Sequence, residues 1–361
     1  MSVLIYIAFL VVNLIIVKLH ENKKFSSNFR LFFFIVLCLN IFLFGVLRFD
    51  VGNDYSNYVD RYYGIRDYDV FVTPDYFLFK MLTNLFSSLQ NGYLYVIGVY
   101  YITTMGFFLR FFKKNNILFW GIFTLITFGF YFDILDRIRQ LAALSLFIYT
   151  IDDLNKNNFK GYFVKVILAS LLHISAIIML PFFFFSKIKL PDKAILLIYF
   201  LAIVGFFIGL WSNLIVLIYD NIPYYNEIYR NSKYYGQADD TSTSLGFLGK
   251  TLFILINILY SPINLRLKTL LTLGLLISII GVGNLNIERI ADYLLLFTIY
   301  SFPLLLKVKF ERKTNRVLLL LPTILFLLIL FTKDNNQEYF KYQTIFSDNY
   351  KYQIFKTRNY K

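Results

Sequence analysis

The chain has 361 residues, of which 58% are hydrophobic and only 16% are charged, and its mean hydropathy is +0.60. Soluble domains carry roughly 25% charged residues, and the apolar residues here form long blocks that could cross a bilayer, so a soluble fold is excluded. The net charge of +14 comes from short basic clusters between these blocks, a pattern typical of cytoplasmic loops. No nucleic-acid partner is therefore expected.

The apolar blocks predict an all-α polytopic membrane protein, a single transmembrane domain over 1–361, with about ten transmembrane helices. In chain order the predicted spans are Val3–Val17, Leu31–Leu47, Tyr93–Leu109, Ile117–Phe132, Ile138–Ile151, Ala194–Tyr219, Leu245–Tyr260, Thr269–Val282, Ile290–Leu306 and Val317–Phe331. Pro74–Leu89 is predicted to be an amphipathic helix at the outer membrane surface. The first span has neither a basic segment before it nor a small-residue cleavage site after it, so we expect it to be retained.

One further apolar block, Gly161–Phe185, is interrupted by His173 and Ser175. It is either one span or a re-entrant hairpin of two half-helices. With the hairpin, more than half of the basic residues and few acidic ones lie on the cytoplasmic side, whereas a single crossing places Lys307–Arg316 outside. The positive-inside rule therefore favours the hairpin, with both chain termini outside. The large outer segments are then 48–92, 220–244 and the tail 332–361.

Four polar groups lie at the outer ends of these spans, where ionisable residues are costly and often functional. The first follows the second span and contains Arg48, Asp50, Asn53, Asp54, Tyr55 and Tyr58. Gly52 permits a tight turn in this segment. Asp54 and Tyr58 are one helical turn apart and can share a face. An interfacial loop with ordinary capping explains this group about equally well.

The second group opens the fifth span. Asp133 and Arg137 are four residues apart, as are Asp136 and Gln140, so both pairs can meet on a helix. Arg139 lies at a helix N-terminus, where its guanidinium and free backbone N–H groups form a site suited to phosphate. The alternative is that both arginines extend toward the interface and pair with the two aspartates.

The third group is His173 with Ser175, at the tip of the predicted hairpin. A lone histidine is more often structural, but non-helical backbone at membrane depth must line a cavity or be buried in protein. The fourth group opens the eleventh span, where Arg289 and Tyr293 share a face and Asp292 is three residues from Arg289. An Arg–Asp structural pair is the alternative. No second histidine is near His173 and the chain has one cysteine, so we expect no metal and no cofactor.

The ordered set of these groups resembles the EpsG/Wzy group of bacterial polysaccharide polymerases over most of the chain. The matching residues are Arg48, Gly52, Asn53, Asp54, Tyr55, Tyr58, Arg139, Gln140, His173, Ser175, Arg289 and Tyr293. The resemblance implies a GT-C-like helical bundle with extracytoplasmic loops in the bacterial cytoplasmic membrane. It also implies polymerisation of undecaprenyl-diphosphate-linked repeat units of an O-antigen, capsule or exopolysaccharide at the outer face, usually with inversion.

In such a reaction, arginines stabilise the leaving diphosphate without a metal, and we expect Arg139 and Arg289 to do so, supported by Arg137 or Arg48. Asp54 and His173 are both candidates for the general base, and the sequence leaves the choice open. The remaining substrate-binding candidates are Asp50, Asn53, Tyr55, Tyr58, Gln140, Ser175, Asp292 and Tyr293. Expected partners are the lipid-linked donor and acceptor, the bilayer, and a flippase and chain-length regulator of the same pathway.

Three other functions remain open. An O-antigen ligase would share the donor but use a lipid A core acceptor. A membrane O-acyltransferase would need a catalytic histidine with a route for an acyl donor. A flippase for lipid-linked sugars would more often show two repeated halves and charges along a whole pathway, whereas here no repeat is evident and the polar groups lie on one side. The chain also lacks a Walker A motif and a glycine-rich dinucleotide loop.

Overall fold

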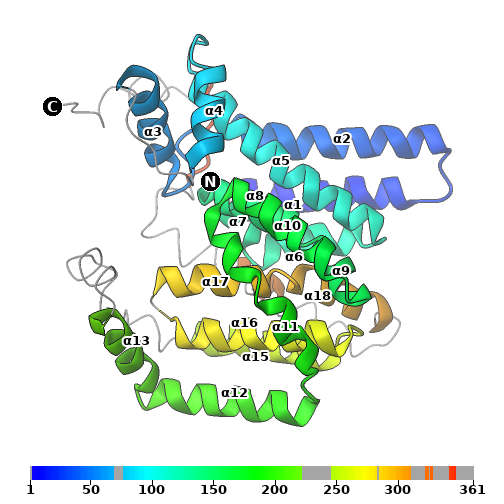
Figure 1. The fold of residues 1–361 in the computed structure, drawn as a ribbon. Coiled ribbons are helices and arrows are strands. Elements are labelled where there is room, and N and C mark those ends of the chain that lie inside the picture. The colour runs from blue at the N-terminus through cyan, green and yellow to red at the C-terminus, as the bar shows by residue number, and fades with distance from the viewer. Residues whose placement is uncertain are drawn as a thin grey trace. The chain divides into compact units, whose positions relative to one another are not determined.

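A computed structural model describes residues 2–68, 76–221, 245–282, 284–309, 322–324, 326–327 and 341–346. These residues form helices and no β-strand (Figure 1), as predicted. The chain divides into two compact units. The first comprises Met1–Leu146, Leu168–Ile174 and Pro322–Lys361, and the second comprises Phe147–Ile167 and Ser175–Leu321.

The first unit contains the N-terminal helices. They are α1 (Ser2–Glu21), α2 (Ser27–Val46), α3 (Tyr55–Tyr68), α4 (Phe77–Leu85), α5 (Gly92–Lys114), α6 (Leu118–Thr127), α7 (Phe130–Asp136) and most of α8 (Ile138–Phe147). A short turn joins α1 to α2, which lie side by side (Figure 1), and the Ser26 side chain caps α2. Between them, Asn40 Nδ2 donates to Asn13 Oδ1 at 3.0 Å, which satisfies amides for which lipid would offer no partner.

One end of this unit gathers segments from both ends of the chain. The Tyr342 amide donates to Ser2 Oγ at 3.1 Å, and its hydroxyl donates to the Phe44 carbonyl at 2.6 Å. The Ile345 amide donates to the Leu47 carbonyl at 3.0 Å. The start of α1, the end of α2 and residues 341–346 therefore share one end of the unit.

The segment after α2 folds into a compact apolar cluster. Tyr55, Val59 and Tyr62 recur at helical spacing along the buried face of α3 and pack with residues of α4 and α5. On the exposed side of α4, Phe77, Met81 and Leu85 are four residues apart and 50–70% exposed. This apolar stripe supports the prediction of a helix lying at the membrane surface.

The second unit is also helical. Its elements are α9 (Thr150–Lys156), α10 (Phe159–Leu172, whose last residues belong to the first unit), the 3₁₀ segment η2 (Ile174–Met179), α11 (Phe182–Phe185), the 3₁₀ turn η3 (Ser186–Ile188), α12 (Asp192–Phe207), α13 (Leu210–Asn221), α15 (Leu245–Tyr260), α16 (Leu265–Ile280), α17 (Leu285–Leu295) and α18 (Thr298–Lys309). Helix α16 packs between α15 and α17 (Figure 1). The side chains of Asn264 and Asn284 cap α16 and α17.

The block Gly161–Phe185 folds back on itself. Helix α10 ends at Leu172, directly before His173. The Tyr162 hydroxyl donates to the Met179 carbonyl at 2.6 Å, and the rings of Phe159 and Phe184 have centroids 5.3 Å apart. A continuous helix would separate Phe159 from Phe184 by roughly 38 Å. These contacts show that the chain reverses its direction after α10, which ends just before the predicted break at His173.

Four described helices are long and apolar enough to cross a membrane, or up to six if two bent pairs each count as one span. The bends are 67° between α6 and α7, and 79° between α12 and α13. They occur at Gly129 and Gly209, whose φ angles of 88° and 70° favour glycine. Helices α8, α15 and α16, which fall in three other predicted spans, have 10, 16 and 16 residues and are not among these four to six. Most of Val317–Phe331, 220–244 and 332–361 lies outside the described residues.

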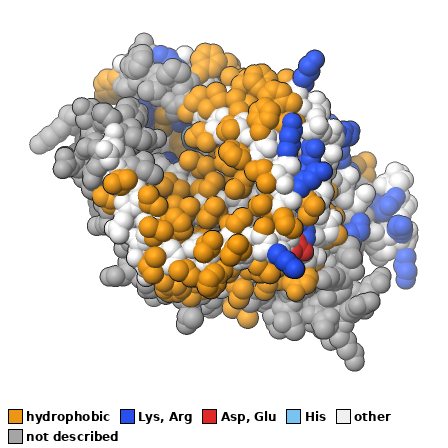
Figure 2. All heavy atoms as spheres, turned by 60° about the horizontal axis from the view of Figure 1, so that its bottom comes forward, with side chains coloured by type: hydrophobic (Ala, Val, Ile, Leu, Met, Phe, Trp, Pro, Cys, Tyr) orange, Lys and Arg blue, Asp and Glu red, His pale blue; other side chains and the backbone are white. Residues whose placement is uncertain are grey.

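Large apolar side chains cover the surface of several helices. Figure 2 shows a face that carries α12 and is covered by hydrophobic side chains, with Lys and Arg gathered along one margin. On α12, Leu197, Phe200 and Phe207 are each more than half exposed. On α2, Phe29 and Phe32 are equally exposed. Such continuous apolar surface is expected against lipid, and the chain is a multi-pass membrane protein.

Candidate functional site

Arg48 is a buried residue at the end of α2, with only 1% of its surface exposed. Its guanidinium donates to the Gly45 carbonyl at 3.0 Å and to the Leu135 carbonyl at 2.9 Å. It also lies over the Tyr101 ring, 5.6 Å from the centroid. These contacts tie the first predicted polar group to the second.

The turn after Arg48 brings the two groups closer still. Gly52 has a φ of 112°, and a Cβ added there would lie 2.6 Å from the Leu135 carbonyl oxygen, so only glycine fits. Just beyond it, the Asp54 amide donates to Asp136 Oδ1 at 2.9 Å. The first turn of α3 is therefore held against the junction of α7 and α8.

At that junction the two neighbouring arginines have different contacts. Arg137 closes α7 and pairs with Asp133 at 3.0 Å, the i,i+4 partner predicted from the spacing. It also donates to Gln140 Oε1 at 3.4 Å. The Arg137 carbonyl accepts the Leu141 amide, which starts α8 and puts Arg139 in its first turn. Arg137 therefore ends α7, whereas Arg139 lies in the first turn of α8.

Arg139 is 4% exposed, and its guanidinium carbon lies 3.5 Å from the centroid of the Tyr76 ring. Arg61 of α3 lies 4.5 Å from the same centroid. The Tyr100 side chain is a third neighbour, and its buried hydroxyl has no hydrogen-bond partner among the described residues. A delocalised cation held flat on an aromatic ring is oriented before any ligand arrives.

Tyr58 connects Arg139 to Asp54. Burial is the main cause that raises the pKa of the Tyr58 phenol, and the nearby Asp54 carboxylate raises it further, while the Arg139 guanidinium opposes the rise. The phenol therefore stays protonated at neutral pH and can donate a hydrogen bond. Asp54 Oδ1 itself accepts a hydrogen bond from Asn57 Nδ2 at 3.2 Å. Asp54 and Arg139 therefore both act electrostatically on Tyr58, and with Tyr76 and Tyr100 we call these residues the α3–α8 cluster (Asp54, Tyr58, Tyr76, Tyr100 and Arg139).

The residues at the predicted hairpin tip lie next to the apolar core formed by α3, α4 and α5. Leu172 packs against the cluster of buried side chains that includes Tyr55 and Ile138, and the half-buried His173 follows it directly. The other candidates of the first group lie nearby in sequence. Asp50 adopts a φ of 52° in the turn, and Asn53 is exposed.

The second unit contains the fourth polar group. Tyr293 is fully buried, and its hydroxyl lies 3.0 Å from Ser175 Oγ, so the structure brings together two predicted residues that are 118 positions apart. Its ring also packs edge-on against Phe147, with centroids 5.6 Å apart. Arg289, one turn before Tyr293, and Asp292 are both half-buried.

In the first unit, sequence reasoning missed three residues in or beside the α3–α8 cluster, namely Arg61, Tyr76 and Tyr100. The tyrosines resembled the interfacial aromatic belt of any membrane protein, and only the folding of α3 and α4 onto α5 separates them from it. Among the described residues, no three His, Cys, Asp or Glu side chains lie together as a metal site would require.

Comparison with known families decides the identity. The model of a family described as the EpsG family matches residues 30–344. The chain belongs to the EpsG family. Membership in the EpsG family makes it a membrane polysaccharide polymerase, which is a glycosyltransferase. The match covers both the α3–α8 cluster and the group around Arg289. Neither the curated proteins nor the solved structures give a significant match.

Proposed function

We propose that this EpsG family member joins undecaprenyl-diphosphate-linked oligosaccharide repeat units at the outer face of the bacterial cytoplasmic membrane. The donor is the growing glycan on undecaprenyl diphosphate, and the acceptor is the non-reducing sugar of an incoming lipid-linked unit. A flippase and a chain-length regulator of the same pathway would supply the units and set the product length. The product is an O-antigen, capsule or exopolysaccharide chain.

The observation that carries this proposal is the buried and fixed position of the Arg139 guanidinium. Its guanidinium is buried, lies at the first turn of α8, and is oriented by the Tyr76 ring at 3.5 Å. A guanidinium beside a helix N-terminus binds phosphate oxygens strongly, and a site with little water strengthens the attraction. Arg137 pairs with Asp133 at 3.0 Å and is 18% exposed, whereas Arg139 is 4% exposed and stacked on a ring, so we take Arg139 as the better candidate in this turn.

The reaction itself is a substitution at the anomeric carbon of the donor. The acceptor hydroxyl oxygen forms a bond to that carbon, and the bond from the carbon to the diphosphate oxygen breaks. Undecaprenyl diphosphate leaves with the electron pair, so negative charge grows on its phosphate oxygens. Preplaced arginines stabilise that charge without a metal, and attack opposite the leaving group inverts the anomeric centre.

We assign the general base to Asp54. Its carboxylate acts electrostatically on Tyr58, which Arg139 also influences, so acid and guanidinium share one environment in the first unit. The base takes the proton of the acceptor hydroxyl as the new bond forms. His173 remains the second candidate, because an unperturbed imidazole titrates near neutral pH and the residue follows Leu172 of the same apolar core.

Arg289 is proposed as the second arginine on the diphosphate. It lies in the first half of α17, whose N-terminus is capped by Asn284, so its guanidinium is near a positive helix end. The proposal requires Arg139 and Arg289 to act on one substrate from the same side of the membrane.

Deletion of the gene tests the function directly, with surface glycan separated on a gel. Loss of the polymerase is expected to leave a single repeat unit where the parent shows a ladder, and the wild-type gene restores the ladder. A null strain with no surface repeat at all would indicate a flippase instead. An unchanged ladder would refute a role in polymerisation.

A further inference from the structure

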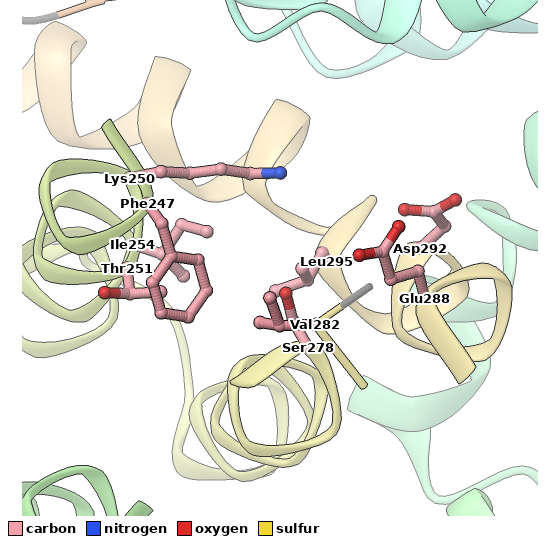
Figure 3. A pocket seen from close by; sticks show the side chains of 9 residues that line it. All are labelled: Phe247, Lys250, Thr251, Ile254, Ser278, Val282, Glu288, Asp292 and Leu295. Atoms are coloured by element: carbon pink, nitrogen blue, oxygen red, sulfur yellow. The ribbon is translucent and has the colours of Figure 1, made fainter. Parts of the chain in front are cut away.

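The second unit contains a small pocket at the start of α15, the end of α16 and the start of α17. Its volume is ≈ 110 Å³. Figure 3 shows the carboxylates of Glu288 and Asp292 next to each other on one wall, with the Lys250 side chain extending across from α15. None of the residues on α15 and α16 belongs to a polar group that the sequence singles out.

The pocket follows from two helical faces. Phe247, Lys250 and Ile254 recur along α15, and Glu288, Asp292 and Leu295 recur at i, i+4 and i+7 along α17. Residues at this spacing lie on the same side of a helix, so each helix presents charged groups beside apolar ones. The result is a pocket in which carboxylates and an ammonium group accompany an aromatic ring and aliphatic side chains.

Two hydroxyls complete the lining. Thr251 Oγ1 donates to the Leu248 carbonyl at 3.0 Å and lies 3.3 Å from the Tyr199 hydroxyl, so its position is fixed. Ser278 contributes the second hydroxyl from the last turn of α16. Both groups can donate and accept hydrogen bonds.

This combination matches the chemistry of one sugar ring. A sugar presents hydroxyl groups around its edge and C–H groups on its faces; carboxylates accept the hydroxyl protons, and the Phe247 ring can cover a C–H face. Two carboxylates and one ammonium group line the pocket, so it offers more acceptors than cationic donors to a sugar's hydroxyl groups. Whole small-ligand sites measure about 300–1,000 Å³, so a pocket of ≈ 110 Å³ holds only one part of a larger ligand.

We propose that this pocket binds the sugar that is bonded directly to the donor diphosphate, with Glu288 and Asp292 accepting hydrogen bonds from its hydroxyls. The proposal rests on the proposed function of Arg289, which lies between these two acids on α17. Where Arg289 binds the diphosphate, the sugar ring that is bonded to that diphosphate lies only one covalent bond farther away. Glu288 and Asp292 are specificity residues in this arrangement, because they select the sugar and hold its anomeric carbon toward the acceptor.

The test measures binding to the full-length protein in nanodiscs. The probes are farnesyl diphosphate alone and farnesyl diphosphate carrying glucose, galactose, N-acetylglucosamine or N-acetylgalactosamine. The wild type is expected to bind at least one glycosylated probe about 10- to 100-fold more tightly than farnesyl diphosphate, the gain from one or two charge-assisted hydrogen bonds. Glu288→Gln and Asp292→Asn are expected to lose that gain while they bind farnesyl diphosphate at least as tightly as the wild type, because each removes a negative charge near the diphosphate. Glu21→Gln, at the far end of α1, serves as the control and keeps both affinities.

The outcomes separate the two proposals. If no sugar improves binding, or if both variants keep the gain, the pocket is not a sugar site, while the proposed function stands. If the wild type does not bind farnesyl diphosphate, or if Arg289→Ala binds it normally, the diphosphate assignment fails and this reading of the pocket fails with it. Recovery of the gain by exchanging Lys250 and Glu288 (Lys250→Glu with Glu288→Lys) would indicate a structural ion pair and also overturn the inference.

Discussion

Replacement of Arg139 is the sharpest test of the cluster, because its neighbour Arg137 provides a matched comparison two residues away. Arg139 is 4% exposed and stacks on Tyr76 at 3.5 Å. Removal of one donor that stabilises a developing anion costs about 2.7–4 kcal/mol, so Arg139→Ala should lower kcat about 100- to 1,000-fold. Arg139→Lys keeps the charge but loses the planar fork and the ring contact, and it should fall between alanine and the wild type.

The comparison variant is Arg137→Ala. Arg137 and Asp133 form an ion pair with side chains 18% and 35% exposed, and such pairs contribute at most about 1 kcal/mol. Its loss should therefore lower the rate no more than about fivefold. The assay is the rate of ladder formation in membranes supplied with lipid-linked repeat units, normalised to the amount of folded protein. Comparable losses in Arg137→Ala and Arg139→Ala, or a near-normal rate in Arg139→Ala, would refute the assignment.

Three further substitutions probe other parts of the first unit. Gly52→Ala should lower the free energy of unfolding by about 1–3 kcal/mol, because the φ of Gly52 is 112° and the new Cβ would meet a carbonyl oxygen. The measurement is the melting temperature. Gly106→Ala is the control and should leave it unchanged, because no atom lies within 4 Å of the new Cβ. Arg48→Met should destabilise the protein by about 2–5 kcal/mol, because two buried carbonyls lose their donor; a normal melting temperature with lost activity would instead indicate substrate binding. Asp54→Asn should lower kcat at least 100-fold while His173→Gln retains most activity, and the reverse order would make His173 the base.

The sequence predicted the hairpin because a polar break inside an apolar block has few structural explanations. His173 marks the end of α10, and the charge distribution chose between the two topologies. The sequence did not predict the bends at Gly129 and Gly209, because glycine also occurs within straight membrane helices.

Within the site, local spacing predicted what lies within one helix. Asp133 and Arg137 meet as their i,i+4 spacing requires. The positions of Tyr76 and Tyr100 around Arg139 depend on how α4, α5 and α8 pack together. These helices are distant in sequence, and no pattern within one sequence predicts such packing. The role of Arg48 also depended on a remote partner, the Leu135 carbonyl, which a search for charged neighbours overlooks.

The central claim is that Arg139 and Arg289 act from the same, outer side of the membrane, and cysteine accessibility tests it most directly. Replacing Cys38, the chain's one cysteine, gives a cysteine-free background. Cysteines at Asn53, beside the α3–α8 cluster, and at Asn286, beside Arg289, should react with a membrane-impermeant maleimide in intact cells. Cysteines at Lys24 and Lys114 should react only after the membrane is permeabilised. Reaction of Asn53→Cys and Asn286→Cys from opposite faces would contradict the account.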